Sequence, residues 1–218
     1  MDMDALFSRR RSIGAALVAV LSLSGIASAV ATAGTASAAT TVVPCADRVE
    51  SLVFAPWADT HPYFSMPNGG FEAGATSWTL SGGAAVVAGN ESFFAGAATD
   101  SHSLAIPARG QATSATICVG LDETLFRLFV KNPGVKGAKL QVQVNVQDPQ
   151  TGKVDQRQFT LDAAKLAAGW SPTDQLRIPK PAANGTGTQN LTLVFTPVGT
   201  AATWNIDDVF IDPFKTRR

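Results

Sequence analysis

The stretch NGGFEAGATSWTLSGGAAVVAGNESFFAGAATDSHSLAIP, residues 68–107, decides the fold. It predicts a strand that ends in Glu72, a strand around Trp78, a Gly-Gly turn, a further apolar strand and, after a glycine-rich loop, a strand at residues 103–106. Short apolar runs bounded by glycine-rich turns are typical of antiparallel sheets. The stretch therefore predicts the opening of a β-sandwich, and nothing in it has a catalytic pattern.

The clearest single strand is residues 139–147, where apolar and polar residues alternate. This period of two predicts one buried and one polar face. Residues 125–130, LFRLFV, are apolar at nearly every position, as in a central strand covered on both sides. Further strands are expected at residues 48–54, 111–119, 154–161, 175–178, 191–196 and 203–211.

About ten short strands with regular turn signals and no long helical pattern predict an all-β protein, an antiparallel β-sandwich or barrel. With the opening stretch we expect the sandwich. We expect a secretory signal peptide at residues 1–38 and an extended N-terminal segment packing on the sandwich at residues 39–67. The sandwich itself is expected at residues 68–214, followed by a tail at residues 215–218.

The signal prediction depends on a basic start, Arg9 to Arg11, an apolar run over residues 13–30, and Ala36-Ser37-Ala38 as a cleavage site. The alternative is a membrane anchor, but Ser and Gly residues interrupt the run and no basic stop-transfer flank follows it. We expect a secreted protein, extracellular or associated with the cell envelope. The sequence leaves both the general and the twin-arginine export routes open.

The charge balance excludes some classes of partner. Three of the 17 basic and two of the 17 acidic residues lie in the signal, which leaves 14 basic and 15 acidic residues in the remainder. A near-zero balance without runs of like charge argues against nucleic acid as a partner, and against a membrane after signal cleavage.

Two cysteines, Cys45 and Cys118, remain after the signal. In an exported protein two thiols favour a disulfide over a metal pair or a nucleophile. Two unpaired buried cysteines are the competing interpretation. The disulfide would fasten the N-terminal part of the chain to a central strand.

Gly70-Phe71-Glu72 near the start and Asp207-Asp208-Val209 near the end, with Asn68 and Trp78, carry a resemblance to a known family. The chain resembles carbohydrate-binding modules with a jelly-roll, galactose-binding-like fold. It also resembles a group of exported actinobacterial proteins through the stretch at residues 68–107, Trp170 with Pro172 and Thr173, and residues 204–213. The second resemblance implies a fold and an export route but no activity.

In those modules the first and last strands are neighbours and often hold a structural calcium. The resemblance therefore implies that Glu72 and Asp207 or Asp208 supply oxygen ligands, helped by backbone carbonyls near Asn68; calcium takes six to eight oxygens. The residues alone also allow Glu72 to cap a turn and the two aspartates to be exposed or paired with basic residues.

Sugar binding requires flat aromatic faces with amides and carboxylates beside them. Aromatic residues in predicted loops are the candidate ligand contacts: Trp57, Tyr63, Phe93, Phe94 and Trp170. The polar rows of residues 141–147, and Gln156 with Gln158, are candidates to line a sheet face. The alternative is that these aromatic residues are core or loop anchors and that the polar rows are ordinary solvent faces.

The motifs of enzymes do not occur in this chain. There is no Gly-x-Ser-x-Gly, His-Glu-x-x-His or phosphate-binding loop, and the only histidines are His61 and His102. Asp207-Asp208 and Asp122-Glu123 are adjacent pairs, and neighbours on a strand point to opposite faces.

We expect a secreted, non-catalytic binding module for an extracellular glycan. The alternatives are a ligand-free structural or adhesion protein of the cell envelope and, third, a weak glycoside hydrolase.

Overall fold

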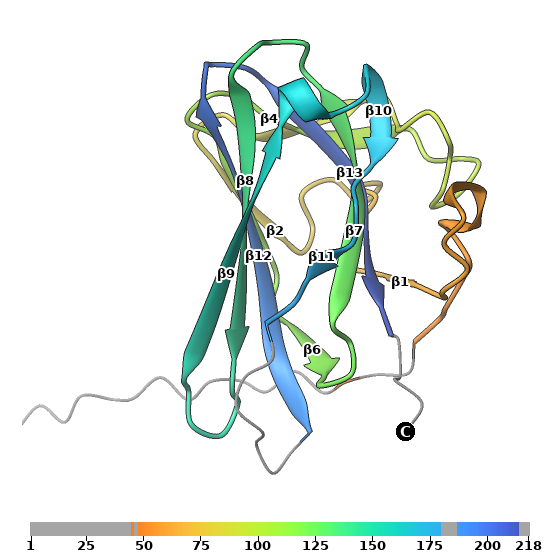
Figure 1. Ribbon diagram of the computed structural model, residues 1–218, viewed down its shortest axis with the longest axis vertical. Helices are drawn as coiled ribbons and strands as arrows, with labels where there is room; N and C mark the ends of the chain where they lie inside the picture. Colours follow the sequence, from red (N-terminus) through yellow and green to blue (C-terminus); the bar gives the residue numbers. More distant parts are fainter. Residues whose placement is uncertain (1–44, 46–47, 180–186, 214–218) are drawn as a thin grey trace, which may run out of the picture. The chain divides into compact units, whose positions relative to one another are not determined.

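A computed structural model describes residue 45, residues 48–179 and residues 187–213. This part of the chain forms two antiparallel β-sheets packed face to face (Figure 1). The predicted all-β sandwich is therefore confirmed, with thirteen strands in the described part where about ten were expected. The predicted signal peptide at residues 1–38, the tail at residues 215–218 and most of the 184–188 loop lie outside the described residues.

The first sheet has seven strands, and its main path runs β10-β7-β13-β4-β3. In addition, β1 pairs with β13 and β11 pairs with β7. Its strands are β1 (Phe64–Ser65), β3 (Ala85–Ala88), β4 (His102–Ile106), β7 (Leu125–Asn132), β10 (Gly169–Pro172), β11 (Leu176–Arg177) and β13 (Trp204–Asp212).

The second sheet has six strands in the order β2-β5-β12-β8-β9, with β6 also paired to β12. Its strands are β2 (Trp78–Ser81), β5 (Gln111–Ser114), β6 (Ile117–Gly120), β8 (Ala138–Gln147), β9 (Val154–Asp162) and β12 (Thr188–Gly199). Two short 3₁₀ helices, η1 (Ala55–Trp57) and η2 (Ala163–Lys165), complete the described elements. The side chain of Asp162 caps η2 by accepting a hydrogen bond from the backbone N–H of Ala164.

The core lies between the sheets and follows the alternation of the sequence. On β8 each of Leu140, Val142, Val144 and Val146 is fully buried, and the residues between them are partly exposed. On β12 the same pattern buries Leu191, Leu193 and Phe195. Leu193 lies directly opposite Val144, and directly opposed residues share a face of the sheet. The buried residues of β12 and β8 therefore face the same core.

Three predicted strands differ from the structure. Residues 111–119 form two strands, β5 and β6, because Ala115 and Thr116 break the pairing to β12. Residues 48–54 make only a bridge between Ser51 and Tyr63 before η1. Residues 67–70 and 72–77 form turns instead of a strand, and Phe71 between them has a φ of 60°.

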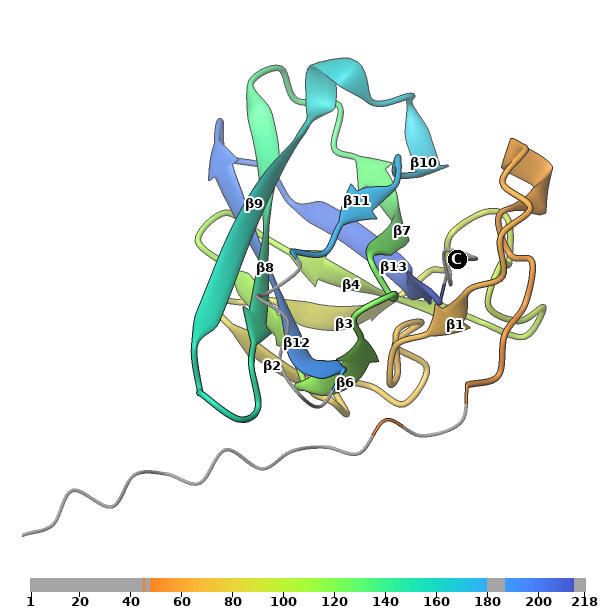
Figure 2. The same ribbon diagram turned by 60° about the horizontal axis from the view of Figure 1, so that its bottom comes forward.

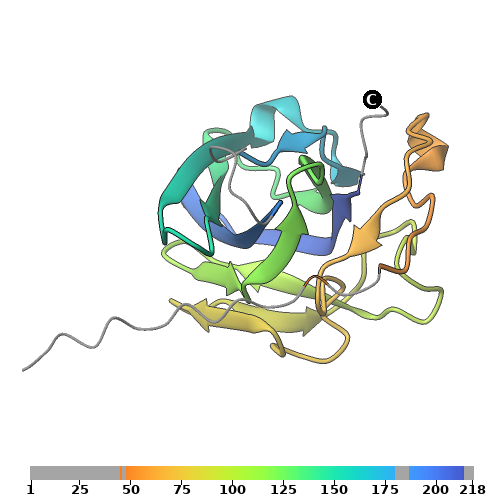
Figure 3. The ribbon, with the colours of Figure 1, turned by 90° about the horizontal axis from the view of Figure 1, so that it is seen from below.

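Residues 48–63 lie over the outer face of the seven-stranded sheet, on the opposite side of the sandwich from β8 and β9, and β1 follows them into the sheet beside β13 (Figures 2 and 3). There Phe54 and Tyr63 form a second apolar cluster with Phe129 of β7 and Phe210 of β13. Strands β7 and β13 thus carry large apolar side chains on both faces, as the sequence predicts for β7. None of the helices in the described part of the chain is long and apolar enough to cross a membrane.

Candidate functional site

The outer face of the six-stranded sheet carries uncharged polar side chains in parallel rows. Gln143 of β8 lies opposite Gln158 of β9, and Asn145 lies between Gln156 of β9 and Thr192 of β12. Gln141 in turn lies between Thr160 and Thr196. These are the polar rows that the sequence offers for a binding surface, and the pairing brings them onto one face.

Hydrogen bonds among these side chains hold the rows in place. The amide of Gln143 donates to Oδ1 of Asn145 at 2.8 Å. The hydroxyls of Thr116 and Thr192 share a hydrogen bond of 3.0 Å, and Gln111 donates to Oγ1 of Thr196 at 3.3 Å. The face therefore presents ordered amide and hydroxyl groups.

A hollow of about 300 Å³ lies at one end of this face. Its lining is polar and uncharged except for the apolar Val154: Thr116, Asn145, Gln147, Val154, Gln156, Asn190 and Thr192. Asn190 was not among the predicted site residues. The sequence pattern could have indicated it, because Asn190 lies two residues before Thr192 and so on the same, outward-facing side of the strand. The inner residues of that strand are Leu191, Leu193 and Phe195.

The predicted aromatic contacts lie on the other side of the sandwich and are only partly brought together. Trp57 meets Phe93 edge to face, with ring centroids 4.9 Å apart and planes at 89°. With Leu52, Val53, Pro56 and Ala95 these two rings line an apolar groove of about 510 Å³. The rings do not form the pair of parallel platforms that stacks along a sugar chain.

The prediction that Tyr63 contacts a ligand is wrong. Its side chain is fully buried because it packs in the second apolar cluster, and its hydroxyl donates to Asp59 at 2.8 Å. Trp170 packs against the second apolar cluster. Phe94 is 50 % exposed and is not among the groove residues, so it does not join Trp57 and Phe93 there.

A buried ion pair fastens this N-terminal segment to the sheet. Arg127 of β7 donates to the carboxylate of Asp59 at 2.8 Å and to the carbonyl of Thr173, and its guanidinium stacks on Phe54. Burial alone would raise the pKa of Asp59, but hydrogen bonds from Tyr63, the backbone of His61, Arg127 and Gln175 together lower it. Asp59 is thus held as a carboxylate.

Asp207 and Asp208 both face the loop at residues 89–100, contrary to the expectation that neighbours on a strand point apart. A β-bulge shifts the register between Asp207 and Phe210, and Asp208 has a φ of 46°. Asp207 accepts a hydrogen bond from the backbone N–H of Glu91, and Asp208 accepts one from Gly96, each at 2.9 Å. The bulge therefore turns both carboxylates toward the same loop.

The predicted calcium ligands are brought together in part. Asp208 and Glu72 line one hollow of about 400 Å³ together with Asp100, whereas Asp207 is not among its lining residues. Both oxygens of Glu72 accept hydrogen bonds from Ser101 and His102. Within residues 48–179 and 187–213, no three Asp, Glu, His or Cys side chains are grouped closely enough to hold a metal ion.

Two glycines make room for the carboxylates of this hollow. A Cβ on Gly96 would lie 2.5 Å from Oδ2 of Asp100 and 2.6 Å from Oδ1 of Asp208. A Cβ on Gly70 would lie 2.8 Å from the same oxygen of Asp208. Asp100 and Asp208 thus converge on a space that only glycine leaves open, and hard carboxylate oxygens are the donors that calcium prefers.

The pKa values of these acids reflect burial and mutual repulsion. Burial raises the pKa of Asp207 to about 9, and the neighbouring charge of Asp208 adds to the shift. Burial raises the pKa of Asp208 to about 7, with further repulsion from Glu91, Asp100 and Glu72. Burial alone would raise the pKa of Glu72. Hydrogen bonds from His102 and Ser101 outweigh this effect and lower the pKa of Glu72 to about 2.

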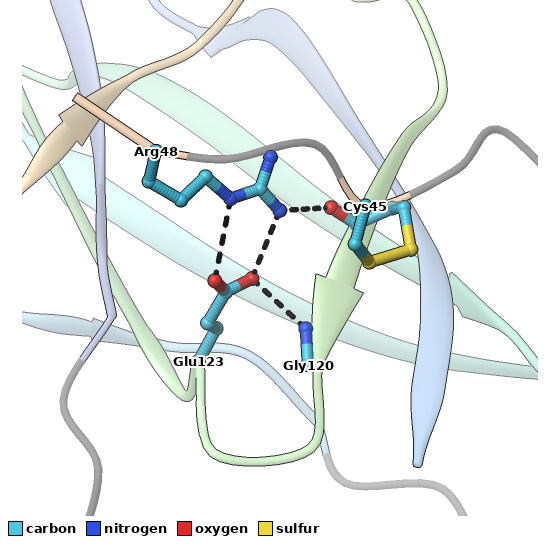
Figure 4. The surroundings of a disulfide bond; sticks show 5 residues. Cys45, Arg48, Gly120 and Glu123 are labelled. Atoms are coloured by element: carbon cyan, nitrogen blue, oxygen red, sulfur yellow. Dashed lines mark hydrogen bonds and ion pairs between the residues drawn. A yellow bond between two sulfur atoms is a disulfide. The ribbon is translucent and has the colours of Figure 1, made fainter. Parts of the chain in front are cut away.

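The predicted disulfide between Cys45 and Cys118 is confirmed (Figure 4). Beside it, Arg48 donates to the carbonyl of Cys118 at 2.6 Å and to both carboxylate oxygens of Glu123. Glu123 also accepts a hydrogen bond from the backbone of Gly120. The bridge and this ion pair together fix the start of the described chain to β6.

Several solved structures resemble this fold. One is a family 61 carbohydrate-binding module in complex with β-1,4-galactotriose, with a TM-score of 0.41 and 18 % identity over 67 % of this chain and 96 % of that one. A xylan-binding module of family 15 has a TM-score of 0.41 and 13 % identity over 70 % and 96 %. A third structure contains the family 22 and catalytic modules of a Clostridium thermocellum xylanase bound to xylohexaose. Its TM-score is 0.43, with 22 % identity over 65 % of this chain and 27 % of that one.

These structures belong to the class of proteins that the sequence resemblance names, the carbohydrate-binding modules. Their identities are too low to transfer a ligand or the role of a residue to this chain. No protein-family model matches the chain, and no curated protein matches it either.

Proposed function

We propose that this protein is a non-catalytic carbohydrate-binding module whose site is the outer face of the six-stranded sheet. The observation that carries the proposal is the set of uncharged amide and hydroxyl rows on β8, β9 and β12, which end in a hollow. Sugars are neutral and present many hydroxyl groups. Asn and Gln amides both donate and accept hydrogen bonds, which suits them to pairs of hydroxyls.

The absence of catalysis in this proposal is supported by the positions of the acidic pairs. Asp207 and Asp208 are buried beneath the loop at residues 89–100. Glu123 is buried and paired with Arg48. Glycoside hydrolysis needs two carboxyl groups that flank the sugar bond. Of Asp207, Asp208 and Glu123, only Asp208 lines a hollow, so neither adjacent pair supplies two such groups.

An adhesion role is the second candidate, and the exposed apolar residues around Trp57 favour it. Leu52 is 55 % and Phe93 is 46 % exposed at the groove, and Val49 is 91 % exposed nearby. Exposed apolar patches often mark protein or membrane contacts. In that role the polar face would be an ordinary solvated surface.

We further propose that calcium binds in the hollow between Asp100 and Asp208. Because no third Asp, Glu, His or Cys side chain of the described residues is grouped closely enough with them, backbone carbonyls near Asn68 would complete the ligand set. The convergence of the two aspartates at Gly96 and Gly70 and the raised pKa of Asp208 support this assignment. Bound calcium would neutralise the carboxylates and hold the loop at residues 89–100 against β13. Its role in this proposal is structural.

Secretion is part of the same proposal. The Cys45–Cys118 disulfide supports an oxidising compartment, because cytosolic thiols are kept reduced. A glycan ligand outside the cell is consistent with that location.

Affinity electrophoresis tests the proposed function. The protein is run through native gels containing xylan, β-1,4-galactan or, as the acidic comparison, polygalacturonate. We expect retardation by at least one neutral polysaccharide. Unchanged mobility in all gels, with binding to protein or hydrophobic surfaces that is lost in Trp57→Ala, would instead favour adhesion.

A further inference from the structure

Asn190 of β12 combines an outward-facing position with almost complete burial. It lies on the same side of its strand as Thr192, on the polar face, yet it is only 2 % exposed. Among the residues that the structure describes, neither its amide nitrogen nor its amide oxygen has a hydrogen-bond partner. Because nearly all buried polar groups in proteins are paired, this amide requires an explanation.

The surroundings of Asn190 form the hollow at the end of the polar face. Asn190 pairs across the sheet with Gln147 on one side and Cys118 on the other. Thr192 and Asn145 form the next row of the lining. Every lining side chain is uncharged, so the hollow offers hydrogen bonds without a charge to attract an acidic or basic ligand.

The chemistry of a free amide limits the ligand. The oxygen accepts and the NH₂ group donates, so a partner must present an acceptor and a donor side by side. Two neighbouring hydroxyls of a sugar ring meet this requirement, since each hydroxyl both donates and accepts. A carboxylate or sulfate would satisfy only the NH₂ group and would enter a lining that lacks a compensating cation.

We propose that Asn190 is the specificity-determining residue of the glycan site and that its hollow is the subsite for one neutral sugar unit with two adjacent hydroxyls. The inference rests on the proposed function. It adds that the free protein keeps Asn190 unsatisfied and that the sugar supplies the missing hydrogen bonds. Leaving a buried amide unpaired costs stability in the free protein, which binding recovers.

A pair of asparagine-to-leucine variants separates this role from a structural one. Leucine has nearly the shape of asparagine without its polar atoms. Asn190→Leu removes an unpaired amide, so we expect the melting temperature to stay equal or rise. Asn132→Leu is the matched control, because Asn132 donates to the carbonyls of Ala163 and Leu166 and accepts from Gly134; its replacement should lower the melting temperature.

Binding is measured by isothermal titration with xylan, β-1,4-galactan and polygalacturonate. We expect Asn190→Leu to weaken binding of the preferred neutral polysaccharide by about 10- to 100-fold, the effect of losing one or two hydrogen bonds. Asn132→Leu should retain the affinity of the wild type at a temperature where it is folded.

Three results would overturn the inference while leaving the proposed function standing. They are equal binding by Asn190→Leu, a loss of stability in Asn190→Leu as large as in Asn132→Leu, and tighter binding of polygalacturonate than of either neutral polysaccharide. Failure of the wild type to bind any of the three polysaccharides would instead remove the proposed function itself.

Discussion

Cys118 of β6 lies directly opposite Asn190 of β12, so the disulfide from Cys45 stands beside the hollow of the polar face. The bridge joins residues 73 positions apart and fastens the N-terminal part of the chain to the sheet that carries the proposed site. The bridge and the proposed site are therefore neighbours in the structure.

Removal of the disulfide should destabilise the protein. In the chain-entropy model a loop of this length contributes about 4 kcal/mol to the free energy of unfolding. We expect the double variant Cys45→Ser/Cys118→Ser to lose stability of this order in urea denaturation monitored by tryptophan fluorescence. A loss below about 1 kcal/mol would show that the bridge does not constrain the unfolded chain.

The register of β8 is tested by a pair of neighbouring substitutions. Val142 is fully buried, and Val142→Ala should lower the free energy of unfolding by about 1 to 3 kcal/mol through lost burial and a cavity. Gln143→Ala, on the outer face, should change it by less than about 0.5 kcal/mol. Equal effects at the two positions would contradict the register.

The ion pair of Asp59 with Arg127 should be essential for the cover over the seven-stranded sheet. Both side chains are only 9 % exposed, so Asp59→Ala leaves a buried guanidinium without its charge partner and should cost about 3 to 5 kcal/mol. His61→Ala is the control, because the His61 side chain is 44 % exposed; it should cost far less. Denaturation of both variants in parallel gives the comparison, and similar small losses would contradict the role of the pair.

The carboxylates of the calcium proposal predict a pH dependence. The pKa of Asp208 is raised in the folded state, so the folded protein binds more protons than the unfolded chain between about pH 4 and pH 7. In chelator, this contribution to stability is present below about pH 4 and is lost as the pH rises through 7. Asp207, with its pKa near 9, continues the loss to higher pH.

Added calcium should therefore raise the melting temperature more at pH 8 than at pH 5, following RT ln(1 + [Ca]/Kd). Asp208→Asn should remove this response, because the charged ligand is lost. Differential scanning calorimetry at the two pH values, with and without chelator, measures both effects. A melting temperature indifferent to calcium at pH 8 would eliminate the metal.

Periodicity and composition were sufficient for much of this fold. The alternation in residues 139–147 predicts which face of β8 is buried, and two cysteines in a chain with a predicted export signal favour a disulfide; the structure has both. The polar rows of β8 and β9 were also visible in the sequence. The local sequence pattern is sufficient to predict burial where the alternation within a single strand determines which face each residue occupies.

Other features depend on segments distant in the sequence. Tyr63 is buried because the segment at residues 48–63 packs over β7 and β13. The sequence predicts that this segment packs on the sandwich, but not which of its aromatic side chains is buried. Asp207 and Asp208 face one loop because a bulge breaks the period of two. From the sequence alone Asn190 is expected to be an exposed residue on the outer face of its strand. It is buried because β12 pairs with both β6 and β8 at this position.

The side-chain amide signals of glutamine and asparagine in a ¹⁵N–¹H NMR titration test the central claim most directly. With the neutral oligosaccharide that matches the retained polysaccharide, we expect shifts of the amides of Gln143, Asn145, Gln156 and Asn190, while the indole signal of Trp57 stays unchanged. A shift of the Trp57 indole with unmoved amides on β8, β9 and β12 would contradict the account, because the sugar would then bind on the opposite side of the sandwich.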